Sequence, residues 1–275
     1  MIYTVVGSTG FIGKNLYNFL HSKGEKVNCI NRGDLLDLDK EYGLLIYCAG
    51  YGDCKKSAEA VLEGNVLWLL EIIKNIKYQR LIYLSSTRLY LDNGKSEENC
   101  KLYINSNDDR RLFNITKLLA EELCVRLAKN VVIVRPSNVY GLALDSQLFI
   151  PMIIKNAIIN KKVDMFVSKK YTKDYICVDD LVEVIHKISK EDVKHGEIIN
   201  VASGVNINAE DIARILIEKT GTTINWHDVT SEDVFPEIDI SKLHSLVKHN
   251  SRNILDDMAK MIEEFNLNIR GGNEK

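Results

Sequence analysis

Hydrophobic and polar positions follow a repeating order along most of the chain. Short apolar runs rich in β-branched residues predict buried strands, and they lie at residues 2–7, 26–31, 44–50, 80–86 and 130–141. Amphipathic stretches between these runs predict helices, at residues 13–24, 59–77 and 110–129. Strands that are apolar on both faces and alternate with helices are typical of a parallel sheet that is covered on both sides. The pattern therefore predicts an α/β fold with a doubly wound parallel sheet.

The order changes after Gly141. The segments that follow predict a helix over 145–162, a short strand that enters a helix over 173–188, and a helix over 207–221. These segments are too small for a second full sheet. We expect them to cover the carboxyl ends of the strands as a cap.

Composition and charge narrow the class of protein. Of the 275 residues, 45% are hydrophobic and 27% are charged, as in ordinary globular proteins. The formal charge of −2, without a basic stripe, argues against a nucleic-acid partner. The apolar runs are short or interrupted, and the chain opens on a strand, so we expect neither a membrane span nor a signal peptide. Six cysteines without a CxxC pair predict free thiols in a reducing cytoplasm, and the six histidines show no metal-ligand spacing.

The stretch "VVGSTGFIG" carries the clearest chemical signal. Gly7, Gly10 and Gly13 follow the first predicted strand and open the first predicted helix. Glycines let the backbone approach a pyrophosphate closely, and the helix N-terminus offers N–H groups and the positive end of its dipole. Since a simple turn requires only one glycine, the spacing predicts a dinucleotide site in a Rossmann-type sheet.

The end of the second strand bears on the choice of dinucleotide. NAD enzymes usually place a carboxylate there for the ribose 2′-hydroxyl, whereas this chain has Asn31 followed by Arg32. A neutral acceptor beside a guanidinium suits a 2′-phosphate, so NADP is favoured and NAD remains possible. The alternative is that Arg32 is a surface residue of the turn "NRGD".

Further motifs follow the glycine turn in order. They are "YCAG", "EGNV", "YLSSTRLY", "VRPSNVYG", "KDYICVDDL" and "IINVASG", and with the turn they cover about residues 1–205. Together they resemble the extended short-chain dehydrogenase/reductases, of the NAD-dependent epimerase/dehydratase type, which act on nucleotide sugars. The resemblance implies a dinucleotide-binding domain of residues 1–142 and 174–203, and a small substrate-binding cap of residues 143–173 and 204–275.

The resemblance also implies a catalytic set. In that family a tyrosine transfers a proton at the sugar oxygen, a lysine four residues later lowers the tyrosine pKa, and a serine or threonine holds that oxygen. The serine corresponds to Ser86 and the lysine to Lys117, but the tyrosine position holds Phe113. Dehydratases follow the hydroxyl residue with an Asp-Glu pair. This chain has Thr87 and Arg88, which argues against 4,6-dehydration.

Binding positions follow from the same motifs. Those implied for the dinucleotide are Gly7, Thr9, Gly10, Phe11, Ile12, Gly13, Asn31, Arg32, Cys48, Ala49, Gly50, Asn65, Ser85, Lys117, Pro136 and Ser137. Those implied for a nucleotide-diphosphate sugar are Ser86, Thr87, Asn138 and Lys173. The usual cap arginine is absent, and the segment "EDVFPEIDISKL" stands in its place.

Phe113 leaves three accounts open. The chain is a Tyr→Phe variant that traps a substrate complex, or another group replaces the phenol, or the protein binds a dinucleotide or a partner without turnover. Candidate replacements by rough position are Tyr90, Tyr103, Tyr140 and Tyr175. Loss of a positioned proton donor costs roughly 10²–10⁴-fold in rate.

We expect an NADP-linked reductase of keto-sugar nucleotides, used in making capsule or lipopolysaccharide sugars. The alternatives are a nucleotide-sugar epimerase and a non-catalytic dinucleotide-binding homologue. Helices near 59–77 and 110–129 resemble those that pair across the family's homodimer, so we expect a homodimer.

Overall fold

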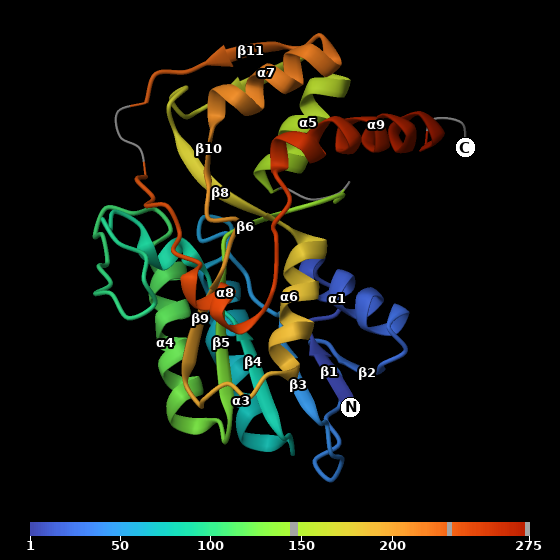
Figure 1. Cartoon of the computed structure of the whole chain (residues 1–275), viewed down its shortest axis with the longest axis vertical. Helices are drawn as coiled ribbons and strands as arrows, with labels where there is room; N and C mark the ends of the chain where they lie inside the picture. Colours follow the sequence, from blue (N-terminus) through green and yellow to red (C-terminus); the bar gives the residue numbers. More distant parts are fainter. Residues whose placement is uncertain (144–147, 230–232, 273–275) are drawn as a thin grey trace.

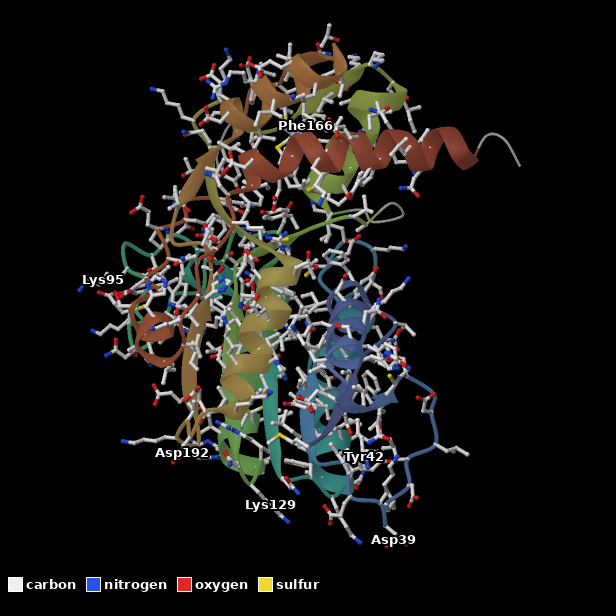
Figure 2. All side chains as sticks on the ribbon, turned by 45° about the vertical axis from the view of Figure 1, so that its right-hand side comes forward. Asp39, Tyr42, Lys95, Lys129, Phe166 and Asp192 are labelled. Carbon is white, nitrogen blue, oxygen red and sulfur yellow. The ribbon has the colours of Figure 1, made fainter. Side chains whose placement is uncertain are left out.

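The computed structural model describes residues 1–143, 148–229 and 233–272. A long parallel sheet with its helices forms the lower part of Figure 1, and a smaller group of helices and short strands lies above it. Tyr42 and Lys129, which precede two strands, mark one end of the molecule in Figure 2, and Phe166 marks the opposite end. The cap therefore lies over the carboxyl ends of the strands, as the sequence predicts.

Six parallel strands form the main sheet, in the order β2-β1-β3-β4-β5-β9. They are β1 (Ile2–Val6), β2 (Lys26–Ile30), β3 (Leu44–Tyr47), β4 (Arg80–Leu84), β5 (Val131–Pro136) and β9 (Glu197–Val201). The strand order reverses beside β1, which creates a crevice at the carboxyl ends where ligands bind in such sheets. The doubly wound α/β fold is confirmed.

Helices cover both faces of this sheet, which explains why its central strands are apolar throughout. On one face α1 (Phe11–Ser22), α6 (Val178–Lys190) and the short α8 (Ser241–Leu246) bury side chains such as Leu20, Leu181 and Leu243. On the other face α3 (Trp68–Asn75) and α4 (Arg111–Leu127) bury Leu69, Ile72, Ala120 and Cys124. Burying one such aliphatic side chain contributes roughly 1.5–3 kcal/mol.

The helix predicted over 59–77 forms in three parts. It comprises α2 (Ala58–Leu62), a π-helical turn η1 (Glu63–Leu67), and α3. Ser57 caps the start, since its hydroxyl accepts a hydrogen bond from the Ala60 N–H at 3.1 Å. Single π-turns of this kind often occur at functional sites. This one contains Asn65, whose buried side chain contacts the loop after β3 and also α4.

The cap has small sheets and its own core. A three-stranded sheet contains β6 (Asn138–Tyr140), β8 (Thr172–Cys177) and β10 (Asn206–Asn208), and a two-stranded sheet contains β7 (Lys162–Met165) and β11 (Thr223–Trp226). The cap helices are α5 (Phe149–Ile159), α7 (Ala209–Thr220) and α9 (Ile254–Gly272). Their apolar faces meet in a core that includes Ile153, Leu216, Met258 and Phe265.

Two predicted elements are wrong in detail. The run 130–141 is two strands, because the chain leaves the main sheet after Pro136 and β6 pairs with β8 instead. The helix predicted over 145–162 begins at Phe149 and ends at Ile159, because Lys162 already pairs with β11. Residues 145–147 of that prediction lie outside the described residues.

The domain boundaries stay a prediction. Leu243 and Val247 fall in the predicted cap range, yet they pack in the core under the main sheet. Within the described ranges, no helix combines the length and the apolar character that crossing a membrane requires. All six cysteines are free thiols.

Candidate active site

The glycine turn has a geometry that only glycine supplies. Gly7 has φ +83°, and an added Cβ would lie 2.9 Å from the Ala49 backbone. A Cβ on Gly13 would lie 2.1 Å from the Gly7 carbonyl oxygen, so the helix packs directly on the turn. Gly10 is the N-cap of α1 and provides no side-chain cap. The first-turn N–H groups of α1 are therefore left for a ligand such as a pyrophosphate.

Asn31 and Arg32, which follow β2, make different contacts. The Asn31 amide oxygen accepts hydrogen bonds from the Ser8 hydroxyl at 3.1 Å and from the Thr9 N–H at 3.2 Å. Asn31 therefore holds the glycine turn in place. Arg32 is exposed, and its guanidinium lies 3.6 Å from the Glu63 carboxylate.

A cavity of about 380 Å³ opens at the carboxyl ends of β1, β3, β4 and β5. The predicted residues that line it are Gly10, Phe11, Ile12, Cys48, Ala49, Gly50, Ser85, Ser86, Thr87, Phe113, Lys117, Pro136, Ser137, Asn138 and Lys173. The predicted residues outside its lining are Gly7, Thr9, Gly13, Asn31, Arg32 and Asn65. The fold thus brings the predicted catalytic and substrate positions into one cavity with the start of α1.

Lys117 lies in the wall of this cavity. Its ammonium donates a hydrogen bond to the Leu84 carbonyl at 2.8 Å and lies 5.0 Å from the centre of the Tyr83 ring. Burial lowers the pKa of Lys117 to about 8, because desolvation disfavours the charged amine. A lysine that is buried beside a carbonyl and two aromatic rings is not an ordinary surface residue of a helix.

Two serines end β4 beside Lys117. Ser86 is the N-cap of the short helix η2 (Thr87–Tyr90), and its hydroxyl accepts a hydrogen bond from the Arg88 N–H at 3.1 Å. The buried Ser85 hydroxyl has no hydrogen-bond partner among the described residues. An unsatisfied buried hydroxyl in a cavity wall is a position where a ligand group would bind. With the glycine turn, it fits a dinucleotide in this cavity.

Asn65 lies behind the cavity wall. Its amide oxygen accepts from the Tyr51 N–H at 3.1 Å, and its amide nitrogen donates to the Tyr51 carbonyl at 3.1 Å and to the Thr116 hydroxyl at 3.0 Å. It therefore joins the loop after β3 to α4, one residue before Lys117. This arrangement holds the cavity wall in shape.

Phe113 lies one helical turn before Lys117, with its ring centre 5.9 Å from the Lys117 ammonium. The Arg110 guanidinium lies over the same ring, at 4.7 Å. No group of Phe113 can transfer a proton. The position predicted for the catalytic phenol is therefore an apolar surface between two cations.

The candidate replacement phenols lie elsewhere. The Tyr90 hydroxyl donates to Asn200 at 2.8 Å, and the Tyr140 hydroxyl donates to Asp257 at 2.8 Å. Tyr103 is 59% exposed. Tyr175 lines a smaller hollow of about 200 Å³. Among the described residues, Tyr51 is the tyrosine that lines the main cavity, and it is not among the four candidates.

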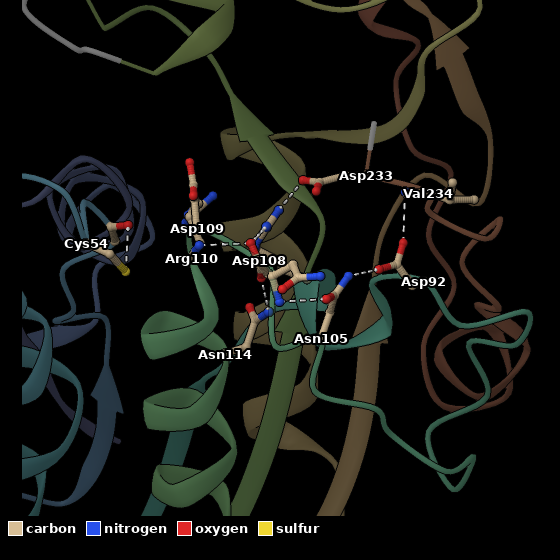
Figure 3. A network of polar contacts seen from close by, with 12 residues as sticks. Cys54, Asp92, Asn105, Asp108, Asp109, Arg110, Asn114, Asp233 and Val234 are labelled. Carbon is tan, nitrogen blue, oxygen red and sulfur yellow. Dashed lines mark hydrogen bonds and ion pairs between the residues drawn. The ribbon is translucent and has the colours of Figure 1, made fainter. Parts of the chain in front are cut away.

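The other end of the cavity carries groups that the motifs did not assign to the site. Arg88 donates to Asp108 at 2.7 Å and to Asp233 at 2.9 Å. Figure 3 shows these two carboxylates close together, although they come from the loop before α4 and from the cap segment. The cap residues that follow Asp233 also line the cavity, namely Phe235 and Pro236. Because the contacts join distant parts of the chain, no local spacing could predict them.

Comparison with known proteins decides the family. The pattern of the NAD dependent epimerase/dehydratase family matches residues 3–202, which is most of the chain. The chain belongs to this family. The match confirms the family that the motifs predict, and it extends to the end of β9.

Individual members of the family show how far the similarity reaches. The dTDP-D-glucose 4,6-dehydratase of Dictyostelium discoideum is 26% identical over an alignment of 230 residues, and the alignment covers 77% of this chain. The chain spans only 52% of that relative's length.

Solved structures share the fold at low identity. MoeE5 in complex with UDP-glucuronic acid and NAD has a TM-score of 0.80 at 20% identity, covering 96% of this chain and 98% of its own. RMD from Pseudomonas aeruginosa with NADPH has a TM-score of 0.78 at 17% identity, covering 98% of this chain and 100% of its own. The two structures hold different nicotinamide dinucleotides, so the shared fold leaves the choice between them to the residues of this chain.

Proposed function

We propose that the protein is an NADP-linked reductase of keto-sugar nucleotides that serves surface polysaccharide synthesis. The observation that carries this proposal is the cavity that joins the start of α1 to Ser86 and Lys117. Arg32, exposed beside the glycine turn, suits a 2′-phosphate. Arg88 stands where dehydratases need an acid and is already bound to two carboxylates, which disfavours elimination.

The residues of this chain divide the work of such a reaction. A nicotinamide held by these residues would supply a hydride to the carbonyl carbon of the sugar. Ser86 would donate a hydrogen bond to the carbonyl oxygen, and Lys117 would hold the nicotinamide ribose and favour negative charge nearby. Phe113 cannot deliver the proton that the resulting alkoxide needs, so turnover in this chain should be slow.

Calorimetric titration with NADP, NAD and the nucleotides UDP, GDP, dTDP and CDP tests the binding part of the proposal. We expect NADP to bind more tightly than NAD, with one diphosphate preferred over the others. NADPH oxidation in the presence of 4-keto nucleotide sugars then tests the reaction. Failure of every dinucleotide to bind would exclude the reductase and its alternatives together.

An epimerase is the second candidate, and one observation favours it. Arg32 lies 3.6 Å from the Glu63 carboxylate, and a carboxylate near the adenosine ribose suits NAD. An epimerase regenerates its dinucleotide in each turnover and holds it tightly. Nicotinamide that stays with the purified protein through gel filtration, without net oxidation of added NADPH, would favour this candidate.

The protonated form of Lys117 should be required for tight dinucleotide binding. Burial lowers the pKa of Lys117 to about 8, so the ammonium loses its proton as the pH rises through that value. If the bound dinucleotide stabilises the ammonium, affinity should fall above pH 8 by up to about tenfold per pH unit. Titration of NADP from pH 7 to 9.5 measures this dependence.

Two variants show whether Lys117 or another lysine of the cavity causes the pH dependence of NADP binding. Lys117→Met should bind NADP more weakly and show no dependence on pH above 8. Lys173→Gln should keep the dependence, although burial and nearby cations also lower the pKa of Lys173 to about 8. A dependence that survives in Lys117→Met would contradict the assignment.

We also propose a cytoplasmic homodimer. Leu62 and Leu67 on the α2–η1 run, and Ile115 and Leu119 on α4, are 40%, 50%, 43% and 43% exposed. Exposed leucines and isoleucines on neighbouring helices suit pairing with a second copy. Light scattering should give twice the 31.3 kDa mass of the chain. The free cysteines fit a reducing compartment.

A further inference from the structure

Three cationic side chains, those of Arg88, Arg110 and Lys173, line the cavity in addition to Lys117. Only Arg88 is neutralised, because Asp108 and Asp233 both bind it. Among the described residues, the Arg110 and Lys173 side chains have no ion pair and no hydrogen bond. Three positive charges thus lie beside the two carboxylates that bind Arg88. Lys117 and the buried Asp174, which accepts hydrogen bonds from Ser203 and Gly204, also line the cavity.

Aromatic rings hold both unpaired cations. The Lys173 ammonium lies 5.0 Å from the centre of the Tyr171 ring and 5.1 Å from that of Phe235. The Arg110 guanidinium lies over Phe113. Ring contacts orient a cation and weaken its hydration, but they leave its N–H groups free to donate. Desolvation and the charge of Arg88 lower the pKa of Arg110 and of Lys173, while the Asp233 carboxylate acts in the opposite direction on both.

Arg110 lies at the reacting end of the cavity. One terminal nitrogen is 3.1 Å from the point where a Cβ on Gly52 would lie, so glycine leaves room for the guanidinium. Its backbone N–H donates to Asp108 at 2.8 Å, the same carboxylate that binds Arg88. Figure 3 shows Arg110 beside Asp108 at the start of α4. The guanidinium is therefore set over Phe113, the ring whose centre also lies 5.9 Å from the Lys117 ammonium.

We propose that the nucleotide-sugar substrate carries a hexuronate, and that Arg110, with Lys173 as a second positive charge, binds the sugar carboxylate. A guanidinium presents two parallel N–H groups that match a carboxylate. Arg110 is solvent-exposed where it lines the cavity, so its N–H groups are open to a ligand. Arg110 also lines the wider hollow of about 1150 Å³ next to the cavity, so a ligand can reach its guanidinium from that side as well. This inference rests on the proposed function.

Matched pairs of nucleotide sugars test the inference. UDP-glucose and UDP-glucuronate, and likewise GDP-mannose and GDP-mannuronate, differ by oxidation at one carbon. With saturating NADP, calorimetry should show the acid of one pair binding about tenfold to a hundredfold more tightly than its neutral partner. Equal affinity within each pair would overturn the inference and leave the proposed function intact. If none of the four binds while NADP does, the inference is overturned, and the dTDP and CDP titrations then decide the proposed function.

Variants test whether Arg110 is the residue that binds the anion, and whether that anion is the sugar carboxylate or the diphosphate. Arg110→Gln should lose the preference for the acid while it still binds NADP, which shows that it folds. Arg126→Gln, on the exposed face of the same helix, should behave as the unmodified protein. UDP alone should bind Arg110→Gln and the unmodified protein equally. If Arg110→Gln weakens UDP as much as UDP-glucuronate, Arg110 serves the diphosphate and the inference is overturned.

Discussion

Phe113→Tyr is expected to raise turnover of a keto nucleotide sugar by about a hundredfold or more, the lower end of what a positioned proton donor supplies. The substitution adds one hydroxyl to a ring that already lies 5.9 Å from the Lys117 ammonium and 4.7 Å from the Arg110 guanidinium. Both cations favour the phenolate, so the new phenol should have a lowered pKa and act near neutral pH. NADPH oxidation with a panel of keto nucleotide sugars measures the effect.

The control for Phe113→Tyr is the same change far from the cavity. Phe166 is 69% exposed, lies in the cap (Figure 2) and does not line the cavity, so Phe166→Tyr should leave turnover unchanged. A rise specific to position 113 would support the account of a trapped Tyr→Phe variant. A Phe113→Tyr protein that stays inert with the whole panel would instead favour a non-catalytic dinucleotide-binding protein. Activity in the unmodified chain equal to that of the variant would indicate another proton donor, with Tyr51 the phenol in the cavity wall.

Arg135→Met is expected to cost about 3–5 kcal/mol of the free energy of unfolding, as for other broken buried ion pairs. Arg135 is 2% exposed and donates two hydrogen bonds to the Glu121 carboxylate, at 2.9 and 2.7 Å, and one to the Tyr90 hydroxyl at 2.8 Å. Removing the guanidinium leaves the Glu121 charge buried without a partner. Urea unfolding followed by circular dichroism measures the loss.

Two further variants make the Arg135 result specific. Arg135→Met combined with Glu121→Leu removes both charges and should recover most of the lost stability. Arg126 also pairs with a glutamate on α4, Glu122, but both side chains are exposed. Arg126→Met should therefore cost less than about 1 kcal/mol. Equal losses at positions 126 and 135 would contradict the argument from burial.

The Arg135 pair also has a consequence for the site. Glu121 lies one helical turn after Lys117 on α4, and Arg135 lies on β5. The pair therefore fixes the register of the helix that carries Lys117 against the strand that leads to Asn138. Arg135→Met should also weaken NADP binding in protein that remains folded.

Much of the fold could be predicted from local pattern. Apolar runs such as those of β3 and β4 predict strands buried on both faces, because only a sheet covered by helices keeps such runs from water. Gly7 and Gly13 predict the phosphate-binding turn, because any side chain there would collide with backbone. Ser86 and Lys117 could be placed by the collinear motifs, and both line the cavity.

The predictions that failed in detail depend on pairing between distant segments. The split of 130–141 into β5 and β6 follows from the partner that each half finds, β9 for one and β8 for the other. The role of Asn31 at the dinucleotide stays a prediction, and the structure adds that its amide oxygen accepts hydrogen bonds from Ser8 and Thr9. Local sequence shows that an acceptor is present, but it does not show which donor lies nearest in the folded chain.

The sequence by itself determined the class of fold, the dinucleotide turn and the absence of a phenol at position 113, because backbone sterics and hydrophobic periodicity act between near neighbours. Only the tertiary structure decided which charges are neutralised. Arg88 finds Asp108 and Asp233, from two distant segments, whereas the Arg110 and Lys173 side chains lie over aromatic rings in the same cavity and have no ion pair with any described residue. Charge pairing depends on distance in space, and the closing of the cap segment over the sheet sets that distance.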